Sequence, residues 1–130
     1  MYEYIKKEGA LIWVIPDGYL PEKSMGELIG HEALCVLNTN DDNASLTLTV
    51  YFEDSDPITD FDLVVDAQRT KHIRLDFIKN SKGEKIPKGV PYAMKVESTI
   101  PIIVQHSRMD TTQEALTLMT TIAYPINLGN

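Results

Sequence analysis

Each of the three histidines in this sequence lies within two residues of an arginine or a glutamate, inside a short polar cluster. The clusters span residues 30–32, 69–74 and 105–110, and in the last two an arginine follows the histidine by two positions. In a β-strand, residues two apart point to the same face, so each of these histidines would share a face with its arginine. Imidazole and guanidinium groups donate hydrogen bonds to carboxylates, phosphates and hydroxyls. These residue types and their spacing indicate a site for a small polar ligand.

The predicted ligand site draws on all three clusters, so residues far apart in the chain must meet in space. Arg69 and Arg108 would anchor an anionic or hydroxyl group, while Glu32 and Gln105 would accept hydrogen bonds. Eight side chains are predicted to line one pocket: His31, Glu32, Arg69, Lys71, His72, Gln105, His106 and Arg108. Four aromatic residues are candidates for the apolar face of a sugar ring, although burial in the core is their commoner role: Trp13, Tyr19, Tyr92 and Tyr124.

Motifs for covalent or nucleotide chemistry are missing from the sequence. It contains neither of the Gly-rich phosphate loops G-x-G-x-x-G and G-x-x-x-x-G-K-[ST], and it has no G-x-S-x-G nucleophile elbow. Cys35 lies in an apolar run with no neighbouring motif that would lower its pKa, so we expect it to pack in the core. We therefore expect a binding module without catalytic residues, a cofactor or a metal ion.

A metal centre is the main alternative, because the three histidines and Glu32 are suitable ligands for zinc, iron or manganese. No two histidines have the close spacing of many such sites, and the charges of Lys71, Arg74 and Arg108 would repel a cation. The corresponding function would be a metal-assisted isomerase or hydrolase of sugars. In a third hypothesis the clusters are ion pairs that fix strand register and subunit contacts in a structural or regulatory protein.

The charge balance argues against a protein that binds duplex DNA. Twelve Lys and Arg residues against 19 Asp and Glu give a formal net charge of −7, whereas DNA binding needs several basic residues on one face. The charges are unevenly distributed, with ten acidic and no basic residues in 24–68, but eight basic and two acidic residues in 69–95. The basic segment 69–95 keeps open the alternative of a regulatory protein that contacts DNA directly. The uneven distribution of charge would also suit head-to-tail assembly of several copies of this chain.

The elements that must position the polar clusters have the periodicity of β-strands. Residues 46–52 alternate between apolar and polar positions, and shorter runs rich in Val, Ile, Leu and Tyr are separated by Gly, Pro, Asn and Asp. The predicted strands are 10–15, 33–37, 46–52, 61–65, 72–75, 92–96, 102–104 and 119–123. Only 111–118 could form a helical turn or two, and 126–130 are expected to fray or mediate contacts.

Length and composition complete the expected architecture. The 130 residues suit one domain, 1–130, with 43% hydrophobic and 24% charged residues. We predict an all-β protein, a single-domain antiparallel β-sandwich of about eight strands. The single cysteine excludes a disulfide within the chain. No apolar segment approaches the roughly 20 residues of a membrane span, and the N-terminal residues lack the apolar region of a signal peptide, so the expected compartment is the cytoplasm.

At the polar clusters the sequence resembles the sensory rhodopsin transducer family. The resemblance covers nearly the whole chain, in the family's order. It rests on these stretches: Gly9…Trp13…Asp17-Gly18-Tyr19-Leu20-Pro21, His31-Glu32-Ala33-Leu34-Cys35-Val36-Leu37-Asn38, Arg69-Thr70-Lys71-His72-Ile73-Arg74, Ser98-Thr99-Ile100-Pro101-Ile102-Ile103-Val104-Gln105-His106-Ser107-Arg108-Met109-Asp110 and Thr120-Thr121-Ile122-Ala123-Tyr124. Two positions depart from the family pattern: Gly30 stands where the family more often has Ser, and Asp17 where it more often has Glu.

The resemblance implies an all-β sandwich that assembles as a homotetramer. It implies a signalling or ligand-sensing role in the cytoplasm, with a sugar-like molecule as the suspected ligand. It also implies a membrane photoreceptor as a partner, and some members of the family are linked to DNA and transcription. Because Gly30 removes a hydroxyl that could touch a ligand, the identity of the ligand does not follow from the resemblance.

Overall fold

The computed structural model describes residues 8–22, 31–110 and 117–126. Among these residues there is no helix with the length and hydropathy needed to cross a membrane. They form eight strands: β1 (Ala10–Tyr19), β2 (His31–Asn38), β3 (Ala44–Tyr51), β4 (Ile58–Val65), β5 (Arg69–Arg74), β6 (Pro91–Asp110), β7 (Thr117–Ile122) and β8 (Tyr124–Ile126). All described pairings between them are antiparallel. The predicted all-β fold class is therefore confirmed.

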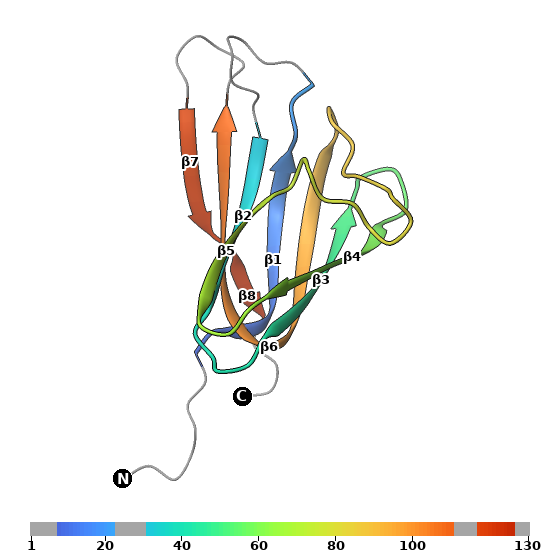
Figure 1. The fold of residues 1–130 in the computed structure, drawn as a ribbon. Coiled ribbons are helices and arrows are strands. Elements are labelled where there is room, and N and C mark those ends of the chain that lie inside the picture. The colour runs from blue at the N-terminus through green and yellow to red at the C-terminus, as the bar shows by residue number, and fades with distance from the viewer. Residues whose placement is uncertain (1–7, 23–30, 111–116, 127–130) are drawn as a thin grey trace, which may run out of the picture.

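The strands form two connected sheets that share the long strand β6 (Figure 1). The first sheet has the order β4-β3-β6-β1-β8, and the second has the order β5-β2-β6-β7. Residues 93–98 of β6 pair with β3, whereas residues 103–109 pair with β2. In Figure 1, β6 turns at the lower end of the domain, with one half beside β3 and the other between β2 and β7.

The change of sheet within β6 occurs at residues 98–101. Along β1, Ile12 is opposite Glu97 and Ala10 is opposite Ile102, so two residues of β1 span five residues of β6. Such a bulge bends a strand strongly. The Trp13 indole donates hydrogen bonds to the carbonyl oxygens of Ile102 (2.9 Å) and Ala10 (3.1 Å), which holds β1 against the bend. The predicted strands 92–96 and 102–104 are therefore two parts of one strand.

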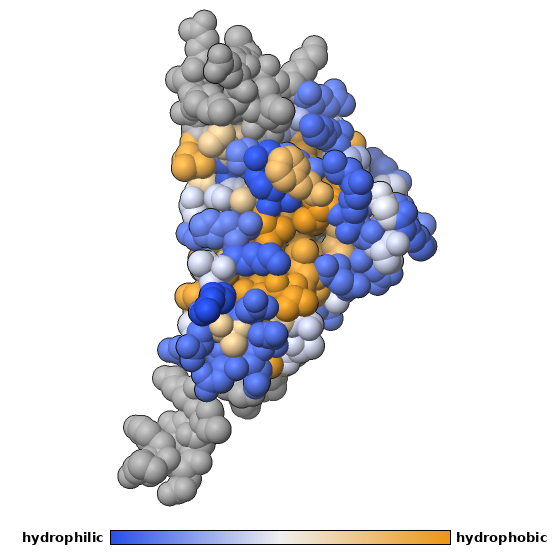
Figure 2. All heavy atoms as spheres, in the orientation of Figure 1, coloured by the Kyte–Doolittle hydropathy of each residue, from blue (hydrophilic) through white to orange (hydrophobic). Residues whose placement is uncertain are grey.

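One hydrophobic core fills the space between the two sheets. The second sheet contributes Leu34, Val36 and Val104, and the first contributes alternate residues of β3 and β6 such as Leu48 and Met94, all of them buried. Figure 2 shows hydrophobic side chains gathered in the middle of one face, with hydrophilic side chains around them. The core fixes which face of each strand points inward, and so decides which polar residues can meet inside the domain.

Two further details differ from the sequence-based expectation. Thr117 and Leu118 belong to β7 rather than to a helical turn, because the strand continues the ladder with β6 to the pair Asp110 and Thr117. The other residues of the predicted helical turn, 111–116, lie outside the described residues, as do 127–130 of the C-terminal segment expected to fray. The strand β8, which pairs with β1 at residues 12–14, was not predicted.

Candidate functional site

The centre of the candidate site is Glu32, a carboxylate with no exposed surface. In the ladder between β2 and β6, Glu32 is opposite Arg108, and Leu34 is opposite His106. Arg108 Nε donates a hydrogen bond to Glu32 Oε2 at 2.7 Å, and the backbone N–H of Tyr19 donates to the same oxygen at 3.0 Å. The hydroxyl of Tyr92 donates to Glu32 Oε1. The carboxylate therefore joins β2 to β1 and to both halves of β6.

The buried contacts hold Glu32 in its charged form. Burial alone would raise the pKa of the carboxyl, but its contacts with His106, Tyr92 and the Tyr19 amide outweigh burial, and the pKa lies below its usual 4.5. The pKa of the Tyr92 hydroxyl is raised by burial and by the nearby Glu32 charge. Tyr92 therefore stays protonated and serves as a donor. Gly18 permits this arrangement, because a Cβ there would meet the Tyr92 ring at 2.4 Å.

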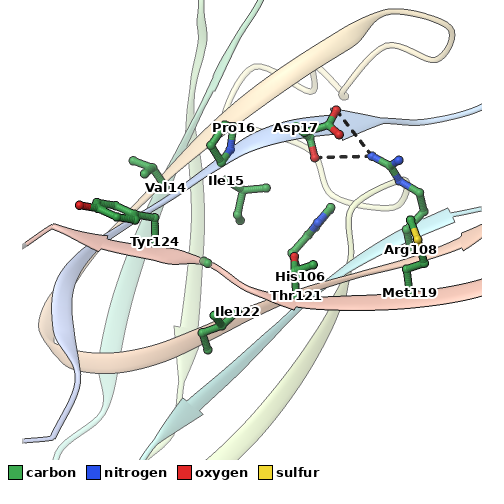
Figure 3. A pocket seen from close by; sticks show the side chains of 11 residues that line it. Val14, Ile15, Pro16, Asp17, His106, Arg108, Met119, Thr121, Ile122 and Tyr124 are labelled. Atoms are coloured by element: carbon green, nitrogen blue, oxygen red, sulfur yellow. Dashed lines mark hydrogen bonds and ion pairs between the residues drawn. The ribbon is translucent and has the colours of Figure 1, made fainter.

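His106 forms the boundary between the buried cluster and a pocket. Its Nε2 lies 3.2 Å from Glu32 Oε1, yet the geometry is not that of a hydrogen bond, and this buried nitrogen has no hydrogen-bond partner among the described residues. Figure 3 shows the His106 ring rising from β6 toward β1 into the space between them. This nitrogen faces the Glu32 carboxylate and has no accessible surface, so His106 borders the pocket with other atoms of its side chain.

The pocket beside His106 has a volume of about 240 Å³ and lies where the edges of the two sheets meet (Figure 3). Eleven residues line it: Val14, Ile15, Pro16, Asp17, His106, Arg108, Met119, Thr121, Ile122, Ala123 and Tyr124. Its size is below the roughly 300–1,000 Å³ that is usual for drug-sized ligands. The lining combines a largely apolar wall with a few polar groups, which suits a guest with one apolar face and several hydroxyls.

The carboxylates outnumber the guanidinium beside the pocket. Arg108 uses Nε for Glu32, and its Nη2 is 3.5 Å from the carbonyl oxygen and 3.9 Å from the carboxylate of Asp17. One guanidinium thus faces two carboxylates, of which Asp17 is largely exposed. A negatively charged guest would meet both carboxylates, so the electrostatics favour a neutral hydroxylated ligand over an anion.

Five of the eight predicted site residues lie elsewhere, so the prediction that all eight line one pocket is wrong. His72 and Gln105 are each opposite Cys35, and these exposed side chains belong to the outer face of the second sheet because their neighbours along the strands point inward. His31 is also on the outer face, next in sequence to the inward-pointing Glu32.

Arg69 and Lys71 lie toward the end of β2 that is remote from Glu32, since they are opposite Asn38 and Val36. Lys71 Nζ donates a hydrogen bond to the carbonyl oxygen of Val64 at 2.9 Å, and both side chains are exposed. The structure therefore brings together only Glu32, His106 and Arg108 of the predicted set. No group of three or more His, Cys, Asp or Glu side chains among the described residues could hold a metal ion.

Sequence reasoning missed the residues that the other elements bring to the site. Tyr92 is expected from its residue type to stack on a sugar or to pack in the core, but its hydroxyl is a main partner of Glu32. Asp17 lies in a stretch that resembles the family, and Met119 and Thr121 lie in a predicted strand, yet no pattern in the sequence places them at the pocket. The only signal is that Asp17-Gly18-Tyr19 follow a predicted strand, which does not show that this segment faces Glu32.

Fold and site together define a small β-sandwich in which a buried carboxylate cluster borders an open pocket. A sequence model described as Anabaena sensory rhodopsin transducer matches residues 8–125, and the chain belongs to this family. The family resemblance drawn from the sequence is thereby confirmed.

Two solved structures are similar along most of their length. A crystal structure of Thermotoga maritima 1070 is 40% identical, with a TM-score of 0.80, and the match covers 91% of this chain and 96% of that one. The Anabaena sensory rhodopsin transducer is 33% identical, with a TM-score of 0.70, and the match covers 85% of this chain and 93% of that one. No curated protein gave a match.

Proposed function

We propose that this chain is a non-enzymatic sensor domain that binds a small neutral polar molecule, such as a sugar derivative, in the pocket bordered by His106 and Arg108. The observation that carries the proposal is that His106 and Arg108, both in contact with the buried Glu32 carboxylate, line one pocket together with Asp17 and Thr121. The Glu32 cluster behind it fixes the positions of the polar groups before a ligand arrives, which lowers the entropic cost of binding.

The family supplies the wider role that we propose. One relative is named as a sensory rhodopsin transducer, so a membrane photoreceptor is a proposed partner of this chain. We further propose that the protein assembles as a homotetramer and works in the cytoplasm, both by resemblance to the family. The formal net charge of −7 disfavours direct contact with DNA.

Ligand binding can be tested at His106 with a matched histidine as control. Replacing His106 with alanine is expected to weaken binding of a neutral monosaccharide roughly ten- to hundredfold, because the pocket loses the imidazole that lines it beside Arg108. His72→Ala changes the same residue type on the outer face and should bind as the wild type does. Isothermal titration calorimetry with galactose, glucose and glucuronate measures both effects. Glucuronate is expected to bind more weakly than glucose because of Asp17 and Glu32.

Unchanged affinity in the His106→Ala protein, together with unchanged stability, would remove the pocket from the proposal. Absence of binding by the wild type to every neutral sugar and polyol tested would remove the sugar class. Tighter binding of glucuronate than of glucose would contradict the electrostatic argument.

The metal-assisted sugar isomerase or hydrolase is tested by elemental analysis. Protein purified without added metal is expected to contain no stoichiometric transition metal, since the described residues do not supply three clustered ligands. The control is the same preparation after incubation with zinc and dialysis. A metal present at one equivalent, and lost in the His106→Ala protein, would instead favour the enzyme.

A further inference from the structure

A second hollow lies at one end of the first sheet, between the loop that joins β3 to β4 and the segment that leads into β6 (Figure 1). Its volume is about 400 Å³, against about 240 Å³ for the pocket of the candidate site. The floor of the hollow is apolar. Phe52 and Ile58 line it and pack against the core, and Val90, which also lines it, is 39% exposed. Such a floor can hold apolar side chains of a bound molecule.

The charged side chains that line this hollow are all acidic: Glu53, Asp54 and Asp56. All three are exposed, and none of them forms an ion pair with another described residue. A concave surface that carries charges of one sign concentrates ions of the opposite sign. The hollow therefore favours a positively charged occupant.

A third hollow, of about 280 Å³, connects this one to the pocket of the candidate site. It shares Phe52, Glu53 and Pro91 with the second hollow. It shares Pro16 and Asp17 with the pocket. We call the second and third hollows together the acidic groove. An extended segment of chain can occupy adjoining hollows at the same time, whereas a compact cation would fill only one of them.

Basic side chains do not fill the acidic groove from within the domain. No described Lys, Arg or His lines it, although Arg108 and Lys95 touch its edge. Arg108 is 3.9 Å from the carboxylate of Asp17 but uses its Nε for the buried Glu32. Lys95 bonds to the Tyr51 hydroxyl and also forms an ion pair with a glutamate of its own strand. The carboxylates of the loop between β3 and β4 therefore remain available to a cation from outside.

We propose that the acidic groove binds an extended basic segment of a partner protein, with apolar side chains on the floor and Lys or Arg side chains at the carboxylates. Alternate side chains of an extended chain point to opposite sides, so a segment that alternates apolar and basic residues meets both surfaces. Cytoplasmic segments of membrane proteins carry an excess of Lys and Arg. That the segment belongs to a membrane photoreceptor rests on the proposed function.

Binding is tested with a short, blocked and fluorescently labelled peptide of alternating Arg and Leu. Fluorescence anisotropy at low ionic strength is expected to show saturable binding to the wild type. The binding should weaken as salt is added, because the carboxylates of the groove are exposed and salt screens them. The matched peptide of alternating Glu and Leu is expected not to bind.

The place of binding is tested by adding the same charge inside and outside the groove. Val90→Lys puts a cation on the floor, and we expect the Arg-Leu peptide to bind it at least about tenfold more weakly. Val64→Lys makes the same change at an exposed valine of β4 that does not line the groove, and it should weaken binding less than about twofold. The two variants have equal net charge, so a difference between them reports position.

The role of the carboxylates is tested by removing two charges at either end of the same strands. Asp54→Asn combined with Asp56→Asn is expected to weaken peptide binding roughly three- to tenfold, because each exposed ion pair contributes little. The control combines Asp42→Asn with Asp66→Asn, exposed residues at the opposite ends of β3 and β4, and should bind nearly as the wild type does. Circular dichroism and thermal unfolding verify that all variants are folded.

No binding of the Arg-Leu peptide to the wild type, or equal losses in a groove variant and its control, would overturn the inference. Arginine amide that binds as tightly as the peptide would identify a site for a small cation, and would also overturn it. None of these measurements needs a sugar. A protein that binds the peptide as expected but binds no sugar would contradict only the proposed function.

Discussion

Replacing Glu32 with alanine is expected to lower the free energy of unfolding by about 3–5 kcal/mol, the usual cost of removing one member of a buried charge pair. The carboxylate accepts hydrogen bonds from Arg108, Tyr92 and the Tyr19 amide. Without it, Arg108 still has the carboxylate of Asp17 nearby, whereas the structure shows no other carboxylate bonded to the Tyr92 hydroxyl or the Tyr19 amide among the described residues. Urea denaturation of the wild type and the variant measures the difference.

The control for this experiment is Glu97, a glutamate in a strand that also has a basic partner. Its carboxylate is 3.4 Å from Lys95 Nζ and is about half exposed, so Glu97→Ala is expected to cost less than about 1 kcal/mol. Equal costs for the two variants would show that Glu32 does not hold the elements together. The isosteric Glu32→Gln protein separates loss of charge from loss of volume, and it should still be markedly less stable than the wild type.

The stability that Glu32 contributes is expected to depend on pH in one direction. Its pKa in the folded protein lies below the usual 4.5, because the contacts with its partners outweigh burial. The folded state therefore binds this proton less readily than the unfolded state does, and the contribution is fully present above pH 4.5. As the pH falls below 4.5 toward the lowered pKa of the folded state, the contribution is progressively lost.

The measurement is the difference in unfolding free energy between the wild type and Glu32→Gln, taken from about pH 7 down to about pH 3. The difference should be constant at the upper end and shrink at the lower end. Asp76 also has a lowered pKa: burial would raise it, but the 2.7 Å ion pair with Arg74 outweighs burial. Asp76 is present in both proteins and its contribution cancels in the difference. A difference that grows as the pH falls would contradict the assignment of a lowered pKa.

The sequence was sufficient for the fold class because the alternation of apolar residues is local information. In β3, alternate residues such as Leu46 and Leu48 are buried, as period-two patterning requires. The division of 92–96 and 102–104 into two strands was wrong because Pro101 and the polar residues before it look like a turn. In the structure they form the bulge at which one strand changes sheet.

The site could be predicted only in part. Spacing along one strand determines which of its residues share a face, but which strands lie side by side depends on the whole fold. The spacing within 105–110 correctly placed His106 and Arg108 on one face, and Glu32 was correctly grouped with them. His72 has the same spacing to its own arginine, but its strand presents it to the outer face, opposite Cys35. One residue of register decides between the two faces, and the apolar residues indicate it: His106 has the parity of the buried Val104, whereas His72 is adjacent to the buried Ile73.

The continuous path of β6 through both sheets has a mechanical consequence. Because the same backbone belongs to both hydrogen-bonded ladders, the layers are joined covalently at the bend that Trp13 secures. Separating the two sheets would require the strand pairs on both sides of that bend to break at the same time. We therefore expect the domain to unfold as one cooperative unit, without a state in which the sheets are intact but apart. The interior of the described domain would then act as a rigid frame, and any change on binding would be confined to the outer strands of the two sheets, β4, β5, β7 and β8.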